Sequence, residues 1–153
     1  MDSKPYFMPQ NPYLSYDDVT IRQQLTFPDS EVQAGLDMEL KSLLIKYGFK
    51  TLLDSTQGQL DAVPSKEWVK KLSPGEKQTL AFIRLLYHQP KLAFLDEASS
   101  ALSVKSEAEL YEECQKKNIQ LVSIGHRPTL RGFHQKILNI GTDESGGWSL
   151  QNI

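Results

Sequence analysis

The sequence predicts an α/β domain with a largely parallel β-sheet. Leu92–Leu95 is a continuous apolar run and Gln120–Ile124 is largely apolar, and both are typical of strands that are buried on both faces of a parallel sheet. Segments with the helical spacing of apolar residues lie before and between these strands, from Val32 to Tyr47 and from Ser103 to Lys117. Strands that alternate with helices along a chain imply this fold class.

The remaining elements are shorter and are bounded by glycine and proline. A strand around Tyr6–Met8 comes before a loop punctuated by prolines, and Gly48 is placed to end the helix that starts near Val32. Residues 54–66 are mostly polar and are expected to form a surface loop. The expected C-terminal elements are a helix over 127–135 and two strands, Lys136–Ile140 and Trp148–Ile153, around a turn at Gly146-Gly147.

The composition is that of an ordinary soluble globular protein. The 153 residues suit one domain with one core, and 39% of them are hydrophobic while 24% are charged. The formal net charge of -2 argues against a protein that binds nucleic acid through bulk positive charge. No nucleic acid is therefore expected as a partner.

The cysteine count and the apolar runs constrain the location. Cys114 is the only cysteine, so the chain alone can form neither an intrachain disulfide nor a cysteine-based zinc site, and a reducing compartment such as the cytosol is favoured. Met1–Pro12 lacks the continuous apolar core of a signal peptide. The longest apolar runs are too short to cross a bilayer, so a membrane role would depend on another segment or another chain.

The segment Ser73-Pro74-Gly75-Glu76 predicts a well-capped helix start. A hydroxyl stands at the N-cap, proline at the first helical position and glutamate at the third, which together make a capping box. A helix N-terminus also presents free backbone N–H groups and the positive end of its dipole, and Gly75 has no side chain to keep a phosphate away. Two interpretations stay open: an anion-binding site, or a helix cap with no further role.

Two acidic residues follow the first of the apolar runs. Asp96 and Glu97 stand directly after Leu92–Leu95, and ligands of α/β sheets bind at the carboxyl ends of strands. One carboxylate could hold Mg²⁺, and the next could orient an attacking water. The alternative is a solvated strand end at which Glu97 caps a helix.

His126 and Gln10 hold corresponding places after the other expected strands. His126 follows Gly125 at the end of the run 120–124, where an imidazole can hydrogen-bond a phosphate oxygen. The alternative is a turn histidine whose hydrogen bonds are satisfied locally. Gln10 follows the first short strand and can reach a metal or a water. Neither His126 nor Gln10 by itself indicates a function.

Taken in chain order, these motifs resemble those of the ATP-binding cassette (ABC) family over essentially the whole chain. They comprise the Q-loop glutamine (Gln10), the signature motif (72–78, with Pro74 where glycine is more usual), the Walker B strand with its catalytic glutamate (92–97), the D-loop (100–103) and the switch histidine (His126). The resemblance implies part of a P-loop NTPase-like ABC ATPase fold, with a mostly parallel sheet and an inserted helical subdomain. The helical subdomain would take up about residues 15–90, and the C-terminal part of the catalytic core about 91–153.

The resemblance also implies a role for each matching residue. Glu97 polarises the attacking water and His126 contacts the γ-phosphate of ATP. Asp96 and Gln10 are the implied ligands of Mg²⁺, and Gln10 also connects to a transmembrane domain through the loop at Asn11–Leu14. The signature residues are expected to bind ATP that is held by a second nucleotide-binding domain, so that two domains sandwich two ATP molecules; these residues are Ser73, Gly75, Glu76 and Gln78.

Within the family, the chain resembles the subfamily D half-transporters of peroxisomes and lysosomes. Residues 72–76, 123–127 and 133–134 carry this resemblance. It implies an ATPase domain that couples ATP hydrolysis to transport, at the cytosolic face of a lysosomal or peroxisomal membrane. The sequence does not identify the transported substrate, because membrane segments determine substrate choice.

Besides Pro74, the sequence departs from the family pattern in three places. No Gly-Lys pair occurs, so the P-loop G-x-x-x-x-G-K-[ST] that cradles the phosphates is absent; we expect the chain to start just after it and to be inactive when isolated. Ser103 stands where aspartate is common in the D-loop, and Thr79 stands where arginine commonly follows the signature.

Two alternatives to a transport ATPase therefore remain. One is a non-catalytic partner or remnant without a P-loop that pairs with an intact subunit. The other is a soluble ABC ATPase, which the absence of a long coiled-coil insertion in residues 47–72 disfavours.

Overall fold

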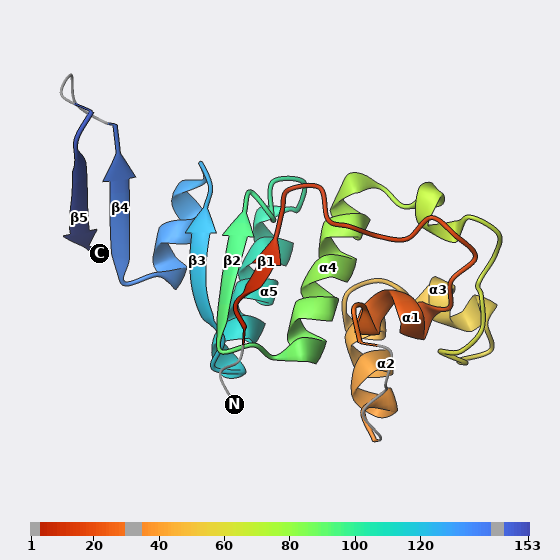
Figure 1. Ribbon diagram of the computed structural model, residues 1–153. Helices are drawn as coiled ribbons and strands as arrows, with labels where there is room; N and C mark the ends of the chain where they lie inside the picture. Colours follow the sequence, from red (N-terminus) through yellow and green to blue (C-terminus); the bar gives the residue numbers. More distant parts are fainter. Residues whose placement is uncertain (1–3, 30–34, 142–145) are drawn as a thin grey trace.

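Three parallel strands form the sheet that positions the candidate site. The computed structural model describes residues 4–29, 35–141 and 146–153. The strands lie in the order β1 (Tyr6–Met8), β2 (Leu92–Asp96) and β3 (Gln120–Ile124) (Figure 1). Met8 pairs with Leu95 and Asp96 pairs with Ile124, so the three carboxyl ends lie at the same edge of the sheet. The predicted α/β class and the parallel pairing are confirmed.

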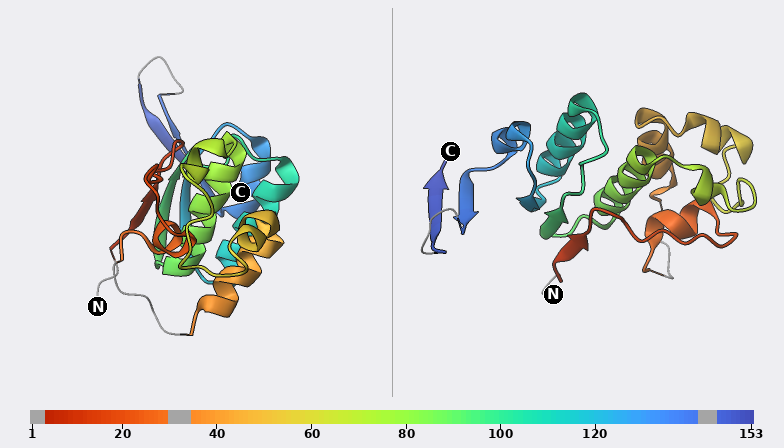
Figure 2. Two further views of the ribbon diagram at one scale, coloured as in Figure 1. Left: turned by 90° about the vertical axis from the view of Figure 1, so that its right-hand side faces the viewer. Right: turned by 90° about the horizontal axis from the view of Figure 1, so that it is seen from above.

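Two long helices cover one face of this sheet. They are α4 (Pro74–His88) and α5 (Val104–Lys116), and both lie on the same side of it (Figure 2). Phe82 of α4 and Tyr111 of α5 are buried, with 5.8 Å between their ring centroids. From β2, Ala93 and Leu95 are buried against them. Removing these apolar side chains from water is the main force that holds the helices on the sheet.

The opposite face of the sheet is open within the described residues. Phe7 is 69% exposed and stacks on Phe94 with 4.9 Å between the ring centroids, and Ile124 is 63% exposed. The prediction that Leu92–Leu95 and Gln120–Ile124 are buried on both faces is therefore wrong for the part of the chain described here. A run in which every residue is apolar hides the alternation that distinguishes one buried face from two.

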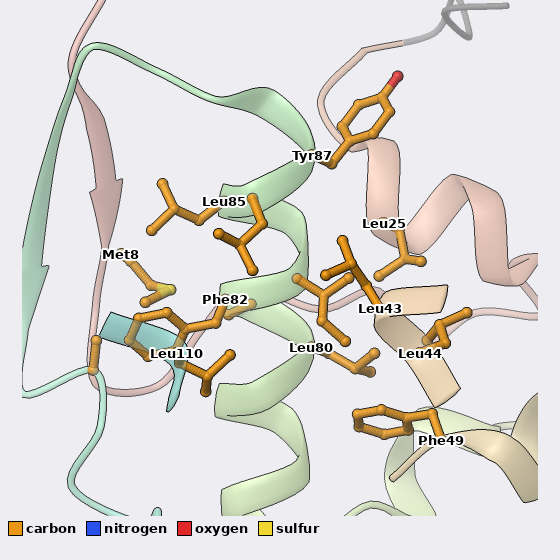
Figure 3. Close-up of a cluster of buried hydrophobic side chains, with 14 of the residues drawn as sticks. Met8, Leu25, Leu43, Leu44, Phe49, Leu80, Phe82, Leu85, Tyr87 and Leu110 are labelled. Carbon is orange, nitrogen blue, oxygen red and sulfur yellow. The ribbon is translucent and has the colours of Figure 1, made fainter. Parts of the chain in front are cut away.

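The helices between β1 and β2 pack on the side of α4 that faces away from the sheet. They are α1 (Ile21–Thr26), α2 (Asp37–Lys46), α3 (Lys50–Ser55) and the 3₁₀ helix η1 (Trp68–Lys71). Figure 3 shows Leu25, Leu44 and Phe49 on this side, near Leu80 of α4, and all four side chains are buried. Because α4 also packs on the sheet, it joins the helical part to the strands.

The helix predicted from Val32 to Tyr47 is confirmed over Asp37–Lys46 as α2; residues 35 and 36 are described and precede it, and Val32 lies outside the described residues. Gly48, the predicted stop, has a φ of +91°, which glycine adopts without strain. The sequence does not predict α3, because six residues are too few to establish a helical period. The loop expected at 54–66 consequently begins after Ser55.

Charged hydrogen bonds fasten the helical part together. Arg22 is 8% exposed, and its guanidinium donates to the carboxylates of Asp37 and Asp61 at 2.6–3.0 Å. These hydrogen bonds hold the pKa of both carboxyl groups below their usual range. Arg84 of α4 is buried as well, and it donates to the carbonyl oxygens of Tyr13 at 2.7 Å and Gln24 at 2.6 Å. Through these bonds α4 holds the segment that follows β1.

The C-terminal residues form a separate antiparallel pair of strands. The 3₁₀ helix η2 (Pro128–Phe133) leads to β4 (Lys136–Ile140), which pairs with β5 (Trp148–Asn152). Both predicted strands are confirmed, and the helix expected over 127–135 is this shorter 3₁₀ helix; residues 142–145 of the connection lie outside the described residues. Within the described residues, every helix falls short of the length and apolar character needed to cross a bilayer.

Candidate functional site

The carboxyl ends of the parallel strands bring three predicted site residues together. Gln10 follows β1, Glu97 follows β2 and His126 follows β3, so all three reach the same edge of the sheet. The Gln10 amide donates to Glu97 Oε2 at 3.4 Å, and His126 Nε2 lies 3.0 Å from Glu97 Oε1. The Glu97 carboxylate therefore lies between the other two side chains, with one oxygen toward each.

The backbone of Glu97 adopts an uncommon conformation. Its φ of +46° lies in the left-handed region, which glycine, asparagine and aspartate populate more readily than glutamate. Two hydrogen bonds hold it there: the Glu97 N–H donates to the carbonyl oxygen of Ile124 at 2.8 Å, and the Ser100 N–H donates to that of Glu97 at 3.1 Å. Such conformations cost about 1–3 kcal/mol and cluster at functional sites.

The exposure of these side chains determines what chemistry the edge can do. The Glu97 side chain is 31% exposed and that of His126 is 87% exposed, so water reaches both. A pocket of about 150 Å³, lined in part by Ser99 and Leu130, opens beside them and has room for water molecules. A carboxylate placed in this way can accept a proton from a hydrogen-bonded water.

Asp96 ends β2 with an exposed side chain. Within the described residues, its carboxylate has no hydrogen bond or ion pair, and the side-chain oxygen of Gln10 has none either. Oxygen donors of this kind are those that Mg²⁺ prefers, so both residues fit the predicted metal site. No group of three or more acidic, histidine or cysteine side chains suited to a metal occurs in the described part of the chain, and Mg²⁺ usually completes its shell with phosphate oxygens and water.

The predicted capping box is present at the start of α4. Ser73 Oγ accepts the Glu76 N–H at 3.2 Å, and the Glu76 carboxylate accepts the Ser73 N–H at 2.8 Å. The Ser73 hydroxyl also donates to this carboxylate at 2.8 Å. Both residues are exposed, and they satisfy one another in this structure. To contact a phosphate, each would have to exchange these hydrogen bonds.

Gly75 lies against the backbone of the loop that follows β2. A Cβ atom at this position would lie 2.9 Å from the carbonyl oxygen of Ala101, a distance that side chains do not tolerate without a shift of the backbone. Packing inside the chain therefore requires a residue without a side chain at position 75, whether or not a phosphate also approaches Gly75.

Gln78 is the only predicted site residue that the structure places in the interior, with an exposed fraction of 3%. Its amide nitrogen donates to the carbonyl oxygen of Gln10 at 3.0 Å and to Ser100 Oγ at 3.1 Å. Its amide oxygen accepts the Ala101 N–H at 2.9 Å. All of these hydrogen bonds are made to other parts of the protein.

Glu107, in the first turn of α5, has a fully buried side chain that sequence reasoning misses. Its carboxylate accepts hydrogen bonds from the hydroxyls of Ser99 at 2.6 Å and Thr129 at 2.8 Å, and it lies 3.5 Å from Arg127 Nη1. Arg127 also donates to the carbonyl oxygen of Ser100 at 2.8 Å. These contacts join the loop after β3 to the loop after β2. An acidic residue in a first helical turn is common on protein surfaces, so the sequence holds no signal for this role.

Comparison with known proteins identifies the family. A profile of the ABC transporter family matches residues 7–100, which is more than half of the chain and includes Gln10, the start of α4 and Glu97. The chain belongs to the ABC transporter family. The P-loop NTPase type of fold and the resemblance of the sequence motifs are thereby confirmed.

The curated relatives include members of subfamily D. The lysosomal cobalamin transporter ABCD4 of Mus musculus is 39% identical over 151 residues, which covers 96% of this chain and 24% of the relative. ATP-binding cassette sub-family D member 3 of Homo sapiens is 35% identical over 154 residues, covering 98% of this chain and 22% of the relative. ABC transporter D family member 3 of Dictyostelium discoideum is 32% identical over 154 residues, covering 97% and 20%.

These matches confirm the resemblance to subfamily D, and they extend over nearly the whole of the 153-residue chain. A lysosomal cobalamin transporter, which the ending 148–153 predicts as a relative, is among these proteins. The chain spans about a quarter of the length of that transporter, 24%.

Proposed function

We propose that this chain is the C-terminal part of the nucleotide-binding domain of a subfamily D-type ABC transporter, in which ATP hydrolysis is coupled to the transport of a substrate across a membrane. Residues of about 15–90 form the helical subdomain and those of about 91–153 the C-terminal part of the catalytic core. The observation that carries the proposal is the meeting of Gln10, Glu97 and His126 at the carboxyl ends of neighbouring parallel strands, where ligands of α/β sheets bind.

The place of each side chain supports a separate role in hydrolysis. Glu97 accepts a proton from the attacking water, since its carboxylate is partly exposed beside the pocket. The side chain of His126 is 87% exposed, so it can exchange its contact with Glu97 for one with the γ-phosphate. Gln10 reaches Glu97 Oε2 at 3.4 Å and helps to fix the direction of the carboxylate.

Asp96 and Gln10 would hold Mg²⁺ through their free side-chain oxygens, directly or through water. The ion, when bound, neutralises charge on the phosphates. The structural support for this part of the proposal is the exposed carboxylate at the end of β2, beside the strand ends that carry Gln10 and His126.

A second nucleotide-binding domain and the transmembrane domain of a half-transporter are the proposed partners. The N-terminus of α4 is accessible, because Ser73 and Glu76 are exposed, so it could meet ATP held by another domain. The proposed location is the cytosolic face of a lysosomal or peroxisomal membrane, and it is supported by the lysosomal transporter among the relatives.

ATP turnover by a fusion protein tests the proposal. Because the chain contains no Gly-Lys pair, a segment with the P-loop pattern G-x-x-x-x-G-K-[ST] is joined ahead of residues 1–153 in one polypeptide. We expect Mg²⁺-dependent ATP hydrolysis by this fusion and negligible hydrolysis by the 153-residue chain alone. The intact nucleotide-binding domain of the mouse relative is the positive control. A fusion that binds ATP but does not hydrolyse it would favour the non-catalytic partner instead.

A further inference from the structure

A buried glutamine connects two of the three loops that form the candidate site. Gln78 lies in α4, but its hydrogen-bond partners are the loop after β1 and the loop after β2. The contact to the Gln10 carbonyl oxygen bridges 68 positions of the sequence, and the contact with Ala101 bridges 23. One side chain therefore holds the start of α4 against both loops at the strand edge.

The nitrogen and the oxygen of this amide both have partners inside the protein. The two N–H groups of an amide are matched by the two nearer acceptors, the Gln10 carbonyl oxygen at 3.0 Å and Ser100 Oγ at 3.1 Å, and a third acceptor, the Glu97 carbonyl oxygen, lies at 3.5 Å. The amide oxygen accepts the Ala101 N–H at 2.9 Å. A side chain that is 3% exposed and bonded at both ends has no group to offer a nucleotide.

The surroundings explain why a glutamine suits this position. The partners are a carbonyl oxygen and a hydroxyl on one side and a backbone N–H on the other, so the side chain must carry a donor end and an acceptor end. A glutamate would place an oxygen against the Gln10 carbonyl. An apolar side chain would leave the Ala101 N–H and the Gln10 carbonyl oxygen without the partner that Gln78 provides, and the two loops would lose their hydrogen bonds to α4.

We propose that Gln78 is a positioning residue for the ATPase site: it holds the loop of Gln10 and the loop of Glu97 in register with α4 and makes no contact with ATP. The role in catalysis rests on the proposed function, whereas the positioning of the loops does not. This positioning role replaces the expectation, taken from the signature motif, that Gln78 binds the nucleotide directly. Gly75 belongs to the same contact, since its missing side chain lets α4 approach Ala101.

Amide hydrogen exchange on the 153-residue chain tests the positioning. Gln78→Met removes the acceptor of the Ala101 N–H, and we expect exchange at Ala101 to become roughly 3- to 10-fold faster. Gln78→Glu keeps the acceptor oxygen but sets a second oxygen against the Gln10 carbonyl, so exchange at Ala101 should rise less than in Gln78→Met. In both variants the carbonyl ¹³C signal of Gln10 should shift in NMR spectra, because the donor to this carbonyl is lost. Unchanged exchange at Ala101 in Gln78→Met overturns the proposal.

A second buried glutamine provides the matched control. Gln24 is 2% exposed, and its amide bonds to the backbone of Ser15 at both ends, through the carbonyl oxygen at 2.9 Å and the N–H at 3.1 Å. Gln24→Met should lower the melting temperature as Gln78→Met does, yet leave exchange at Ala101 unaltered. If both variants speed exchange at Ala101 equally, the effect reports general loss of stability, and the proposal is wrong.

Kinetics of the P-loop-bearing fusion separate positioning from ligand contact. Gln78→Met should lower kcat at least tenfold while the Kd for ATP stays within about twofold, because the residue acts through Glu97 and Gln10. A higher Kd for ATP with an unchanged kcat would identify Gln78 as a nucleotide ligand and overturn the proposal. If the parent fusion does not hydrolyse ATP, the proposed function has failed, and the exchange measurements alone decide whether Gln78 holds the two loops.

Discussion

The helical part and the strand edge are held together by different kinds of hydrogen bond. In the helical part, buried Arg22 is matched by two carboxylates, and buried Arg84 by backbone carbonyl oxygens. At the strand edge, a neutral glutamine and a left-handed Glu97 set the geometry, while Asp96 and His126 remain exposed. The buried charges of the helical part thus fix its shape, and the buried carboxylate of Glu107 does the same beside the strand edge, whereas Asp96 and His126 lie where a ligand can reach them.

The largest expected effect is on the rate of ATP hydrolysis and concerns Glu97 at the strand edge. In the P-loop-bearing fusion, Glu97→Gln should lower the rate of ATP hydrolysis by about 10²–10⁴-fold with little change in ATP binding, because an amide of similar shape cannot accept a proton from water. Single-turnover hydrolysis and equilibrium binding measure the two quantities. Glu67→Gln is the control, since Glu67 also has a left-handed backbone, with a φ of +53°. Glu67 precedes η1 in the helical part and forms an exposed ion pair with Lys70, so its substitution should not change hydrolysis. Near-normal turnover in Glu97→Gln would place the base elsewhere.

The next effect concerns the buried charge at the strand edge. Glu107→Gln should lower the free energy of unfolding by about 1–3 kcal/mol, because hydrogen bonds from Ser99, Thr129 and Arg127 to an ionised acceptor are weakened. Urea unfolding gives the value. Glu109→Gln on the same helix should change it by less than about 0.5 kcal/mol, since that side chain is 44% exposed. Equal effects of the two substitutions would contradict the buried network.

Substitutions of two glycines at the strand edge test whether backbone or side-chain atoms limit close packing there. Gly75→Ala places a Cβ atom 2.9 Å from the backbone oxygen of Ala101, which cannot move without its loop, and we expect a loss of about 1–3 kcal/mol in unfolding free energy. At Gly125 the Cβ atom would lie 2.5 Å from Leu130 Cδ1, the end of a flexible side chain, so Gly125→Ala should cost less. Thermal unfolding of both variants tests the ranking, and the reverse order would refute it.

The smallest expected effect lies in the helical part and depends on pH. Since Arg22 lowers the pKa of Asp37 and Asp61, their contribution to stability is fully present above the ordinary carboxyl pKa of about 3.9 and is lost as the pH falls through the lowered values. The difference in melting temperature between the wild-type chain and Arg22→Met should therefore be largest near neutral pH and shrink in acid. A difference that stays constant down to pH 2 would show that packing of Arg22, and not its charge, is responsible.

Local patterns explain what the sequence predicts correctly. The capping box at Ser73–Glu76 spans four residues, and the strand ends that carry Asp96 and His126 follow short apolar runs, so neighbouring residues are enough to recognise them. The parallel sheet then brings Gln10, Glu97 and His126 to one edge, which the alternation of strands and helices already implies.

Contacts between distant residues explain what the sequence does not predict. Burial of Gln78 and Glu107 depends on partners that lie in other loops, and no feature of their own neighbourhoods distinguishes them from surface residues. The open face beside Phe94 is unpredictable for the same reason, because an apolar run looks alike whether or not anything packs on its second side.

The left-handed backbone at Glu97 has a consequence for evolutionary drift. Among the residues that tolerate a φ of +46° with the least strain are glycine, asparagine and aspartate, and each of these removes or shortens the carboxylate. Substitutions that keep the backbone conformation at position 97 therefore remove or shift the carboxylate that the proposed mechanism uses. β-Branched residues would strain the backbone at this φ in addition to removing the carboxylate. If the proposed function holds, one substitution at Glu97 can remove ATP hydrolysis and still leave a folded chain.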